Sequence, residues 1–117
     1  MSAATRLRRL DEAAEIVVLD QFSRNAHRDT PAAFAQDPLA LALAQELAAS
    51  GHALALPPAQ RVLAYMPYMH SESLAIHDQA LLLFAQPGLA YNLGFEQRHR
   101  AIIERFGRYP HRNAVLG

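Results

Sequence analysis

The stretch Asp37–Gly51, DPLALALAQELAASG, decides whether this part of the chain is helical or extended. Its leucines at positions 39, 41 and 43 alternate with alanines, which is the period of a half-buried strand. Alanine, however, is the best helix former and is depleted in strands, so the composition outweighs the alternation. Asp37-Pro38 supplies a cap and a first-turn proline, and Gly51 supplies a left-handed stop. The stretch therefore predicts a helix that begins at Asp37-Pro38 and ends before Gly51.

Similar signals mark helices before and after this stretch. A first helix is expected over residues 4–24, because apolar residues recur there at spacings of three and four, and Asn25 can stop it. Downstream, Pro57-Pro58 opens another helix, with Val62, Leu63 and Met66 facing inward. Pro67 removes a backbone donor and disfavours helical geometry in the residue before it. We therefore expect this helix to kink or to end near Tyr65.

Two more helices are expected after this proline. Ser71 or Ser73 can cap the first of them, which runs to about Gln86. The second covers roughly residues 89–106 and stops at Gly107, and an irregular tail follows it. No segment has the character of a strand, and every connection is short. The sequence thus predicts an all-α fold, with about five helices stacked as antiparallel hairpins in a single domain over residues 1–117.

Composition restricts the class of molecule and removes several chemistries. The 117 residues are 51% hydrophobic and 19% charged, with a formal net charge of +0, which fits a globular domain. The absence of cysteine excludes disulfides, thiol nucleophiles and Cys-ligated metal sites. All 11 basic residues are arginine, which excludes Schiff-base chemistry and a phosphate-loop lysine. No apolar run is long enough for a membrane span or a secretion signal, so we expect a cytoplasmic protein with no membrane partner.

The segment DQFSRN at residues 20–25 follows an apolar run and carries the first candidate site. A carboxylate beside such a run is costly unless it is paired, and Arg24 lies one helical turn after Asp20 in the favourable order. One interpretation is an ordinary helix-stabilising pair with Asn25 as the C-cap. The other is that Asp20, Gln21, Arg24 and Asn25 line a polar pocket, since buried charges cluster at functional sites.

The second candidate is His70-Ser71-Glu72, which lies just beyond Pro67. His70 and Glu72 do not share a helix face, but a kink or a cap can bring them together. The rest of a metal-ligand set is missing, so we expect no bound metal and no cofactor. The order His-Ser-Glu is no sign of a hydrolase triad, because triad members are assembled in space. His77, on an apolar helix face, is best explained as a core histidine with its hydrogen bonds satisfied.

The C-terminal part is basic and supplies the third candidate. Between residues 96 and 112, five arginines outnumber two glutamates. A nucleic-acid surface would present exposed aromatic residues or a longer basic stripe, whereas Phe95 and Phe106 are better explained as core residues. We therefore expect a solvated helix face and no nucleic-acid partner. The candidate pocket residues from this part are Arg108, His111, Arg112 and Asn113.

Three separated motifs read LDQFxRN at residues 19–25, HSE at residues 70–72 and RFGRxPHRN at residues 105–113. In this order they resemble the bacterial family catalogued as domain of unknown function 924. The resemblance covers about residues 16–117 and implies an all-helical, tetratricopeptide-like fold, but no activity, substrate or cofactor. Ser23 stands where the family usually has proline. Members of the family usually extend past both ends of this chain, so we expect either a fragment or a shortened member.

These observations favour a helical-hairpin binding module whose polar pocket takes a small molecule or a peptide. The alternative is a small hydrolase-like enzyme that uses Asp20 or Glu72 as a base, with His70 or His111 as its acid–base partner. A third interpretation is a purely structural interaction protein. Because residues 16–19 are apolar on every side, we also expect a homodimer with the first helix at its contact. A functional site is favoured if six side chains converge on one cleft, namely Asp20, Arg24, His70, Glu72, His111 and Asn113.

Overall fold

Four α-helices and one short 3-10 helix make up the part of the chain that the structure describes. The computed structural model describes residues 37–110 together with Ala14, Ile16 and Asp20. Its elements are α3 (Asp37–Ser50), η3 (His52–Ala55), α4 (Pro58–His70), α5 (Leu74–Phe84) and α6 (Ala90–Phe106). No strand occurs in these residues, so the prediction of an all-α fold is confirmed. The predicted helix at residues 4–24 lies largely outside the described residues.

The alternating leucine–alanine stretch is a helix, as its composition predicts. α3 ends at Ser50, and Gly51 follows with a left-handed φ of 77°. The buried face of the helix consists of Ala40, Ala44 and Leu47, which are spaced three and four residues apart. Leu39 is 49% exposed, so the alternating leucines do not form one buried face, as a half-buried strand would require.

α4 passes through Pro67 and ends at His70, so the alternative that it ends near Tyr65 is wrong, while the alternative of a kink there stays a prediction. A proline inside a helix removes one N–H donor and leaves the carbonyl four residues earlier, that of Leu63, without its helical partner. Leu63 is 42% exposed, which contradicts its expected inward position. Tyr68 and Met69 are buried beyond the proline. Their packing offsets the lost backbone bond and keeps the last turn helical.

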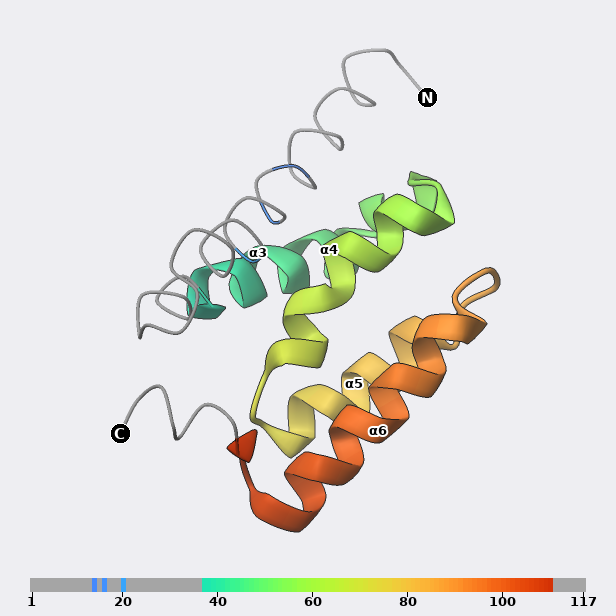
Figure 1. Cartoon of the computed structure of the whole chain (residues 1–117). Helices are drawn as coiled ribbons and strands as arrows, with labels where there is room; N and C mark the ends of the chain where they lie inside the picture. The colour runs from blue at the N-terminus through green and yellow to red at the C-terminus, as the bar shows by residue number, and fades with distance from the viewer. Residues whose placement is uncertain (1–13, 15, 17–19, 21–36, 111–117) are drawn as a thin grey trace.

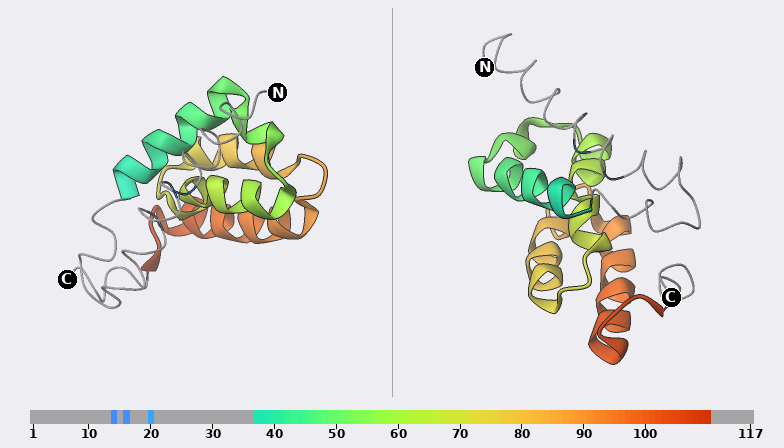
Figure 2. Two further views of the ribbon diagram at one scale, coloured as in Figure 1. Left: turned by 90° about the horizontal axis from the view of Figure 1, so that it is seen from above. Right: turned by 90° about the vertical axis from the view of Figure 1, so that its left-hand side faces the viewer.

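Consecutive helices lie side by side and run antiparallel (Figure 1). α4 packs against α3, α5 and α6, and it is therefore the central element of the described fold. In the right-hand view of Figure 2, α3 and α4 lie above the α5–α6 pair. The predicted stacking of antiparallel hairpins matches this arrangement, while the tetratricopeptide-like detail stays a prediction.

The hydrophobic core is centred on α4. The ring of Tyr65 is 1% exposed and packs edge-to-face against Tyr68 and Phe84, with centroid separations of 6.4 and 6.0 Å. Such edge contacts stabilise a core beyond the area that they bury. Ile16, from the apolar run near the start of the chain, is fully buried in the same core. This part of the apolar run is therefore covered within a single chain.

Burial in this core raises the pKa of the Tyr68 phenol above its ordinary value of 10.0, and the neighbouring Tyr65 adds to the shift. The folded state thus holds this proton more tightly than the unfolded state does. The resulting contribution to stability is complete below about pH 10 and is lost as the pH rises through the folded-state pKa. We expect the free energy of unfolding to fall in that alkaline range, and Tyr68→Phe to reduce the fall. Urea melts of both proteins at neutral and alkaline pH test this, and an equal fall in the variant would contradict it.

Gly88, in the connection between α5 and α6, has a φ of 88° and lies against the first turn of α4. A Cβ at this position would come within 3.0 Å of Pro58 Cγ, and the rigid proline ring limits the room to relax. Gly88→Ala should therefore cost about 1–3 kcal/mol in the free energy of unfolding. The matched control is Gly51→Ala, because Gly51 has a similar φ of 77° but no atom within 4 Å of an added Cβ. Equal losses in denaturant melts would show that the contact with Pro58 is unimportant.

Candidate functional site

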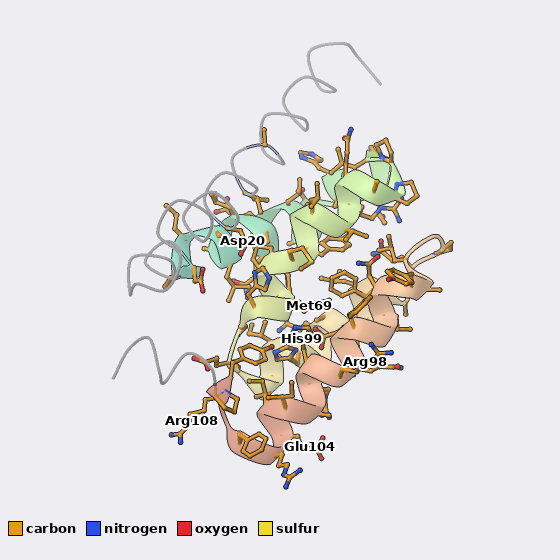
Figure 3. All side chains as sticks on the ribbon, viewed as in Figure 1. Asp20, Met69, Arg98, His99, Glu104 and Arg108 are labelled. Atoms are coloured by element: carbon orange, nitrogen blue, oxygen red, sulfur yellow. The ribbon has the colours of Figure 1, made fainter. Side chains whose placement is uncertain are left out.

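Asp20 and His70 meet although 50 residues separate them in the sequence. The Nδ1 atom of His70 lies 2.8 Å from Oδ1 of Asp20. The Asp20 side chain is 1% exposed and that of His70 is 17% exposed. A carboxylate buried this deeply needs a hydrogen-bonded partner, and the imidazole supplies one. The structure thus joins the first two candidate motifs, and Figure 3 shows Asp20 beside α4.

A cavity of about 240 Å³ adjoins this contact. The start of α3 and the end of α4 form its walls, together with the turn that follows α4. Its apolar lining comes from Pro38, Leu41 and Pro67, and its polar lining from Asp37, His70, Ser71 and Glu72. Asp37 is a site residue that the sequence analysis missed, because its position before a proline marked it only as a helix start.

Glu72 belongs to this lining and is held by the segment after α6. Its Oε2 atom accepts a hydrogen bond of 2.6 Å from the backbone N–H of Tyr109. The phenol of Tyr109 in turn donates a hydrogen bond of 2.5 Å to the carbonyl oxygen of Met69. Tyr109 is only 5% exposed, although the sequence placed it in an irregular tail. The signal that could have found it is a large aromatic residue inside the motif RFGRxPHRN.

The remaining candidates divide into one described residue and six that the structure does not describe. Arg108 is exposed, it does not line the cavity, and its side chain points away from the helices (Figure 3). The candidates outside the described residues are Gln21, Arg24, Asn25, His111, Arg112 and Asn113. The predicted pair of Asp20 with Arg24 therefore stays a prediction, and His70 is the partner of Asp20 that the structure describes.

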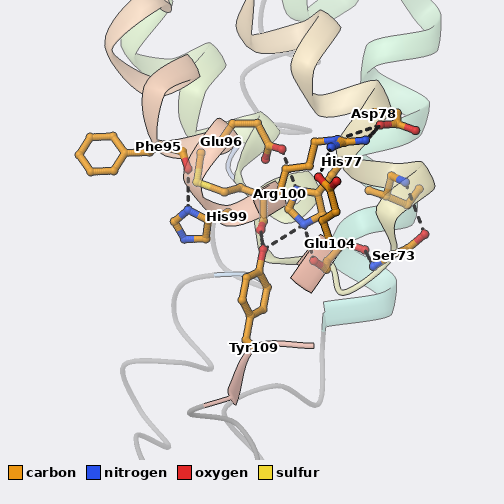
Figure 4. Close-up of polar contacts among 12 residues, drawn as sticks. Ser73, His77, Asp78, Phe95, Glu96, His99, Arg100, Glu104 and Tyr109 are labelled. Atoms are coloured by element: carbon orange, nitrogen blue, oxygen red, sulfur yellow. Dashed lines mark hydrogen bonds and ion pairs between the residues drawn. The ribbon is translucent and has the colours of Figure 1, made fainter. Parts of the chain in front are cut away.

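A second polar cluster, composed of His77, Glu96 and Tyr109, lies in the interior next to the cavity turn (Figure 4). The His77 and Glu96 side chains are both 0% exposed, and His77 Nδ1 lies 2.7 Å from Glu96 Oε2. His77 Nε2 lies 2.6 Å from the carbonyl oxygen of Ser71 and 3.0 Å from the Tyr109 hydroxyl. The interpretation of His77 as a satisfied core histidine is confirmed. Its acidic partner on α6 was not predicted.

The partners of His77 determine where its protons lie. A carbonyl oxygen only accepts hydrogen bonds, so the Nε2 atom of His77 carries a hydrogen and donates it to Ser71. The Tyr109 hydroxyl donates its own hydrogen to the Met69 carbonyl. In the contact between Tyr109 and His77, the hydroxyl oxygen is therefore the acceptor and the Nε2–H of His77 is the donor. One further proton lies between Nδ1 of His77 and Oε2 of Glu96. The other carboxylate oxygen of Glu96 is buried and has no hydrogen-bond partner among the described residues, so His77 is the partner on which this carboxylate depends.

The side chains at the cavity suit hydrogen bonding and proton exchange. The imidazole of His70, whose Nδ1 atom is held by Asp20, brings to the cavity lining a ring that can donate or accept a proton. The Ser71 hydroxyl accepts a hydrogen bond of 3.1 Å from the Ser73 N–H, and the Ser73 hydroxyl accepts one of 3.4 Å from the Ile76 N–H. Ser73 is therefore the N-cap of α5, which is one of the two alternatives predicted, and Ser71 holds the N–H of this cap residue. Within the described ranges, no three His, Asp or Glu side chains gather in a way that could hold a metal ion.

The basic face of α6 is solvated. Arg100 forms ion pairs of 2.9 Å with Asp78 and with Glu104, and the hydrogen bond that it donates to Asp78 is the main reason that its pKa is raised. Arg105 lies over the ring of Phe106, which is 50% exposed, so the expected core position of Phe106 is wrong. Phe106 is the last residue of α6, where no neighbouring helix covers it in the described structure. No helix among the described residues has the length and apolar character needed to cross a membrane.

Comparisons with known proteins agree with the three motifs and the helical fold. The model of a family described as "Bacterial protein of unknown function (DUF924)" matches residues 2–117. A solved structure, the protein of unknown function ATU0120 from Agrobacterium tumefaciens, is 42% identical to this chain, with a TM-score of 0.83. The match covers 90% of this chain and 59% of that structure, so the chain spans less than two thirds of the length of its relative. No curated protein matches the sequence.

Proposed function

The chain belongs to the bacterial family DUF924, and we propose that it is a binding module for a small polar molecule, held in the cavity between the start of α3 and the end of α4. The observation that carries this proposal is the contact of His70 with Asp20. A carboxylate that is 1% exposed holds an imidazole that is 17% exposed in the cavity lining. Burial of an acid costs free energy, and such arrangements concentrate at functional sites.

The size and lining of the cavity restrict the molecule that it suits. A volume of about 240 Å³ is below the roughly 300–1,000 Å³ of pockets for drug-sized ligands, so a metabolite of few atoms or one residue of a peptide fits best. Pro38, Leu41 and Pro67 suit a short apolar part. The carboxylates of Asp37 and Glu72 are acceptors, which favours a molecule with amine or hydroxyl donors.

A thermal-shift screen with amino acids, small amines and polyols tests this proposal. A compound that binds the folded state alone, at about 100 times its Kd, should raise the free energy of unfolding by about 2.7 kcal/mol. His70→Ala and Glu72→Gln should reduce the shift. The matched controls are His52→Ala and Glu46→Gln, because neither residue lines the cavity. An equal shift in His70→Ala and the wild type, or no shift with any compound, would argue against this cavity as the site.

The same contact favours a second candidate function, a small hydrolase-like enzyme. In such an enzyme Asp20 would orient the imidazole, and His70 would act as a general base toward water. General-base catalysis by a positioned histidine contributes roughly 10²–10⁴-fold to a rate. Asp20→Asn should then lower turnover of a bound ester or amide by about that factor while binding persists. Product detection by mass spectrometry distinguishes the two functions, since a binding module releases its ligand unchanged.

Assembly as a homodimer stays a prediction. Its motivation is the apolar run at residues 16–19, of which Ile16 is already buried within one chain. Light scattering of a dimer should give a mass near twice the 12.9 kDa of the chain. A monomer at high protein concentration would mean that the remaining apolar residues of this run are covered within the chain as well.

A further inference from the structure

We propose that His77, Glu96 and Tyr109, here called the buried network, set the shape of the turn that lines the cavity. This inference rests on the proposed binding function of that cavity. The network consists of side chains from α5, from α6 and from the segment after α6. None of its three residues lines the cavity, so they act as positioning residues and not as ligands of the bound molecule.

The observation behind this inference is that each of the four consecutive residues 69–72 is held by a hydrogen bond to a residue from another part of the chain. The Tyr109 hydroxyl donates to the carbonyl of Met69 at 2.5 Å, and His77 donates to the carbonyl of Ser71 at 2.6 Å. The Tyr109 N–H donates to the carboxylate of Glu72 at 2.6 Å. The fourth residue, His70, is held by Asp20 at 2.8 Å.

These contacts fix the direction in which the cavity residues point. The carbonyls of Met69 and Ser71 flank His70 in the chain, so fixing both restricts the backbone dihedrals that aim its imidazole. The Tyr109 N–H binds one oxygen of Glu72 and thereby orients the carboxylate in the cavity lining. Glu96 acts one step further away, because its carboxylate keeps Nδ1 of His77 occupied and leaves the Nε2–H for Ser71.

Stability alone is a weak explanation for such a network. Replacing a buried ionisable pair by apolar side chains of similar volume is often neutral or stabilising. His77 and Glu96 are both 0% exposed, and the second oxygen of Glu96 has no described partner, which an optimised stabilising pair would not leave. The hydrogen bonds of the network instead end on the turn that lines the cavity. The buried network therefore contributes to the geometry of the site more than to the free energy of unfolding.

The double variant His77→Phe with Glu96→Leu tests this inference, because it fills the space while removing the hydrogen bond from His77 to the Ser71 carbonyl. Amide hydrogen exchange measured by NMR should become at least about tenfold faster at residues 71, 72 and 109, while amides in the middle of α5 and α6 keep wild-type rates. Tyr109→Phe should accelerate the exchange at residues 72 and 109 without disturbing the core. Uniform acceleration over the whole chain, or unchanged exchange at the turn, would overturn the inference.

Glu96→Gln is the conservative variant that should rescue the geometry. Its amide NH₂ can donate to Nδ1 of a neutral His77, which keeps the Nε2–H on Ser71. Exchange at the turn should therefore stay within about threefold of the wild type, and long-range ¹H–¹⁵N NMR of the ring should show a protonated Nε2. Loss of both signatures in Glu96→Gln would contradict the assigned proton positions. The exchange measurements use no ligand, so failure of the compound screen would refute the binding proposal while leaving this inference to its own test.

Discussion

Replacing Asp20 with alanine should lower the free energy of unfolding by about 3–5 kcal/mol, the usual cost of breaking a buried charged pair by removing one partner. The carboxylate is 1% exposed and lies 2.8 Å from His70, so the truncation leaves both a void and an imidazole that has lost its partner. The change also removes a link between Asp20, near the start of the chain, and the end of α4. Urea unfolding at neutral pH measures the loss directly.

The matched control for this prediction is Asp78→Ala. Asp78 pairs with Arg100 at 2.9 Å, but its side chain is 58% exposed, and exposed pairs contribute little to stability. We therefore expect its loss to be a small fraction of that caused by Asp20→Ala. A loss below about 1 kcal/mol for Asp20→Ala would show that the carboxylate is solvated, and the site proposed around it would lose its main support.

Replacing Glu96 with alanine should cost about as much, roughly 3–5 kcal/mol, because it leaves His77 fully buried without its acidic partner. The double change of His77→Phe with Glu96→Leu should remain within about 2 kcal/mol of the wild type, since it removes the polar groups together and keeps the volume. Denaturant melts of the single and double variants form the comparison. A double variant that is as unstable as Glu96→Ala would mean that the network is needed for folding itself, and the argument that it chiefly shapes the turn would fail.

The helix boundaries were predictable because their signals are local. A capping serine at residue 73, a left-handed glycine at residue 51 and another at residue 107 act within one turn of the residues that they terminate. Pro67 shows the limit of such signals. A proline by itself interrupts a helix. Tyr68 and Met69, which follow Pro67, are nevertheless buried where α4 packs against its neighbouring helices. That packing depends on residues far along the chain, so the local rule was overridden.

In the candidate site, too, the sequence identified individual polar residues but not the partners that they contact. Asp20 was identifiable as an acid that needs a partner, because it directly follows an apolar run. Spacing along the helix predicts Arg24, one turn away, as that partner. The partner that the structure describes is His70, which is 50 residues away. His77 was identifiable as a core histidine from its helix face, but nothing in the sequence links it to Glu96 on α6. Tyr109 was marked only as an aromatic residue inside the motif at residues 105–113, and its contacts depend on where the chain turns after α6.

The sequence by itself determined the all-α class, most of the helix ends from residue 37 onward and the excluded chemistries of thiols and lysines; the end of α4 beyond Pro67 was not among them. These follow from composition and from interactions between residues within one helical turn. The tertiary structure alone decided which polar groups meet: Asp20 with His70, Glu96 with His77, and Glu72 with Tyr109. In a sequence, a buried polar group can be recognised as a polar residue among the apolar positions of a helix face. Its partner is chosen by how the helices pack, and that packing is a property of the whole fold.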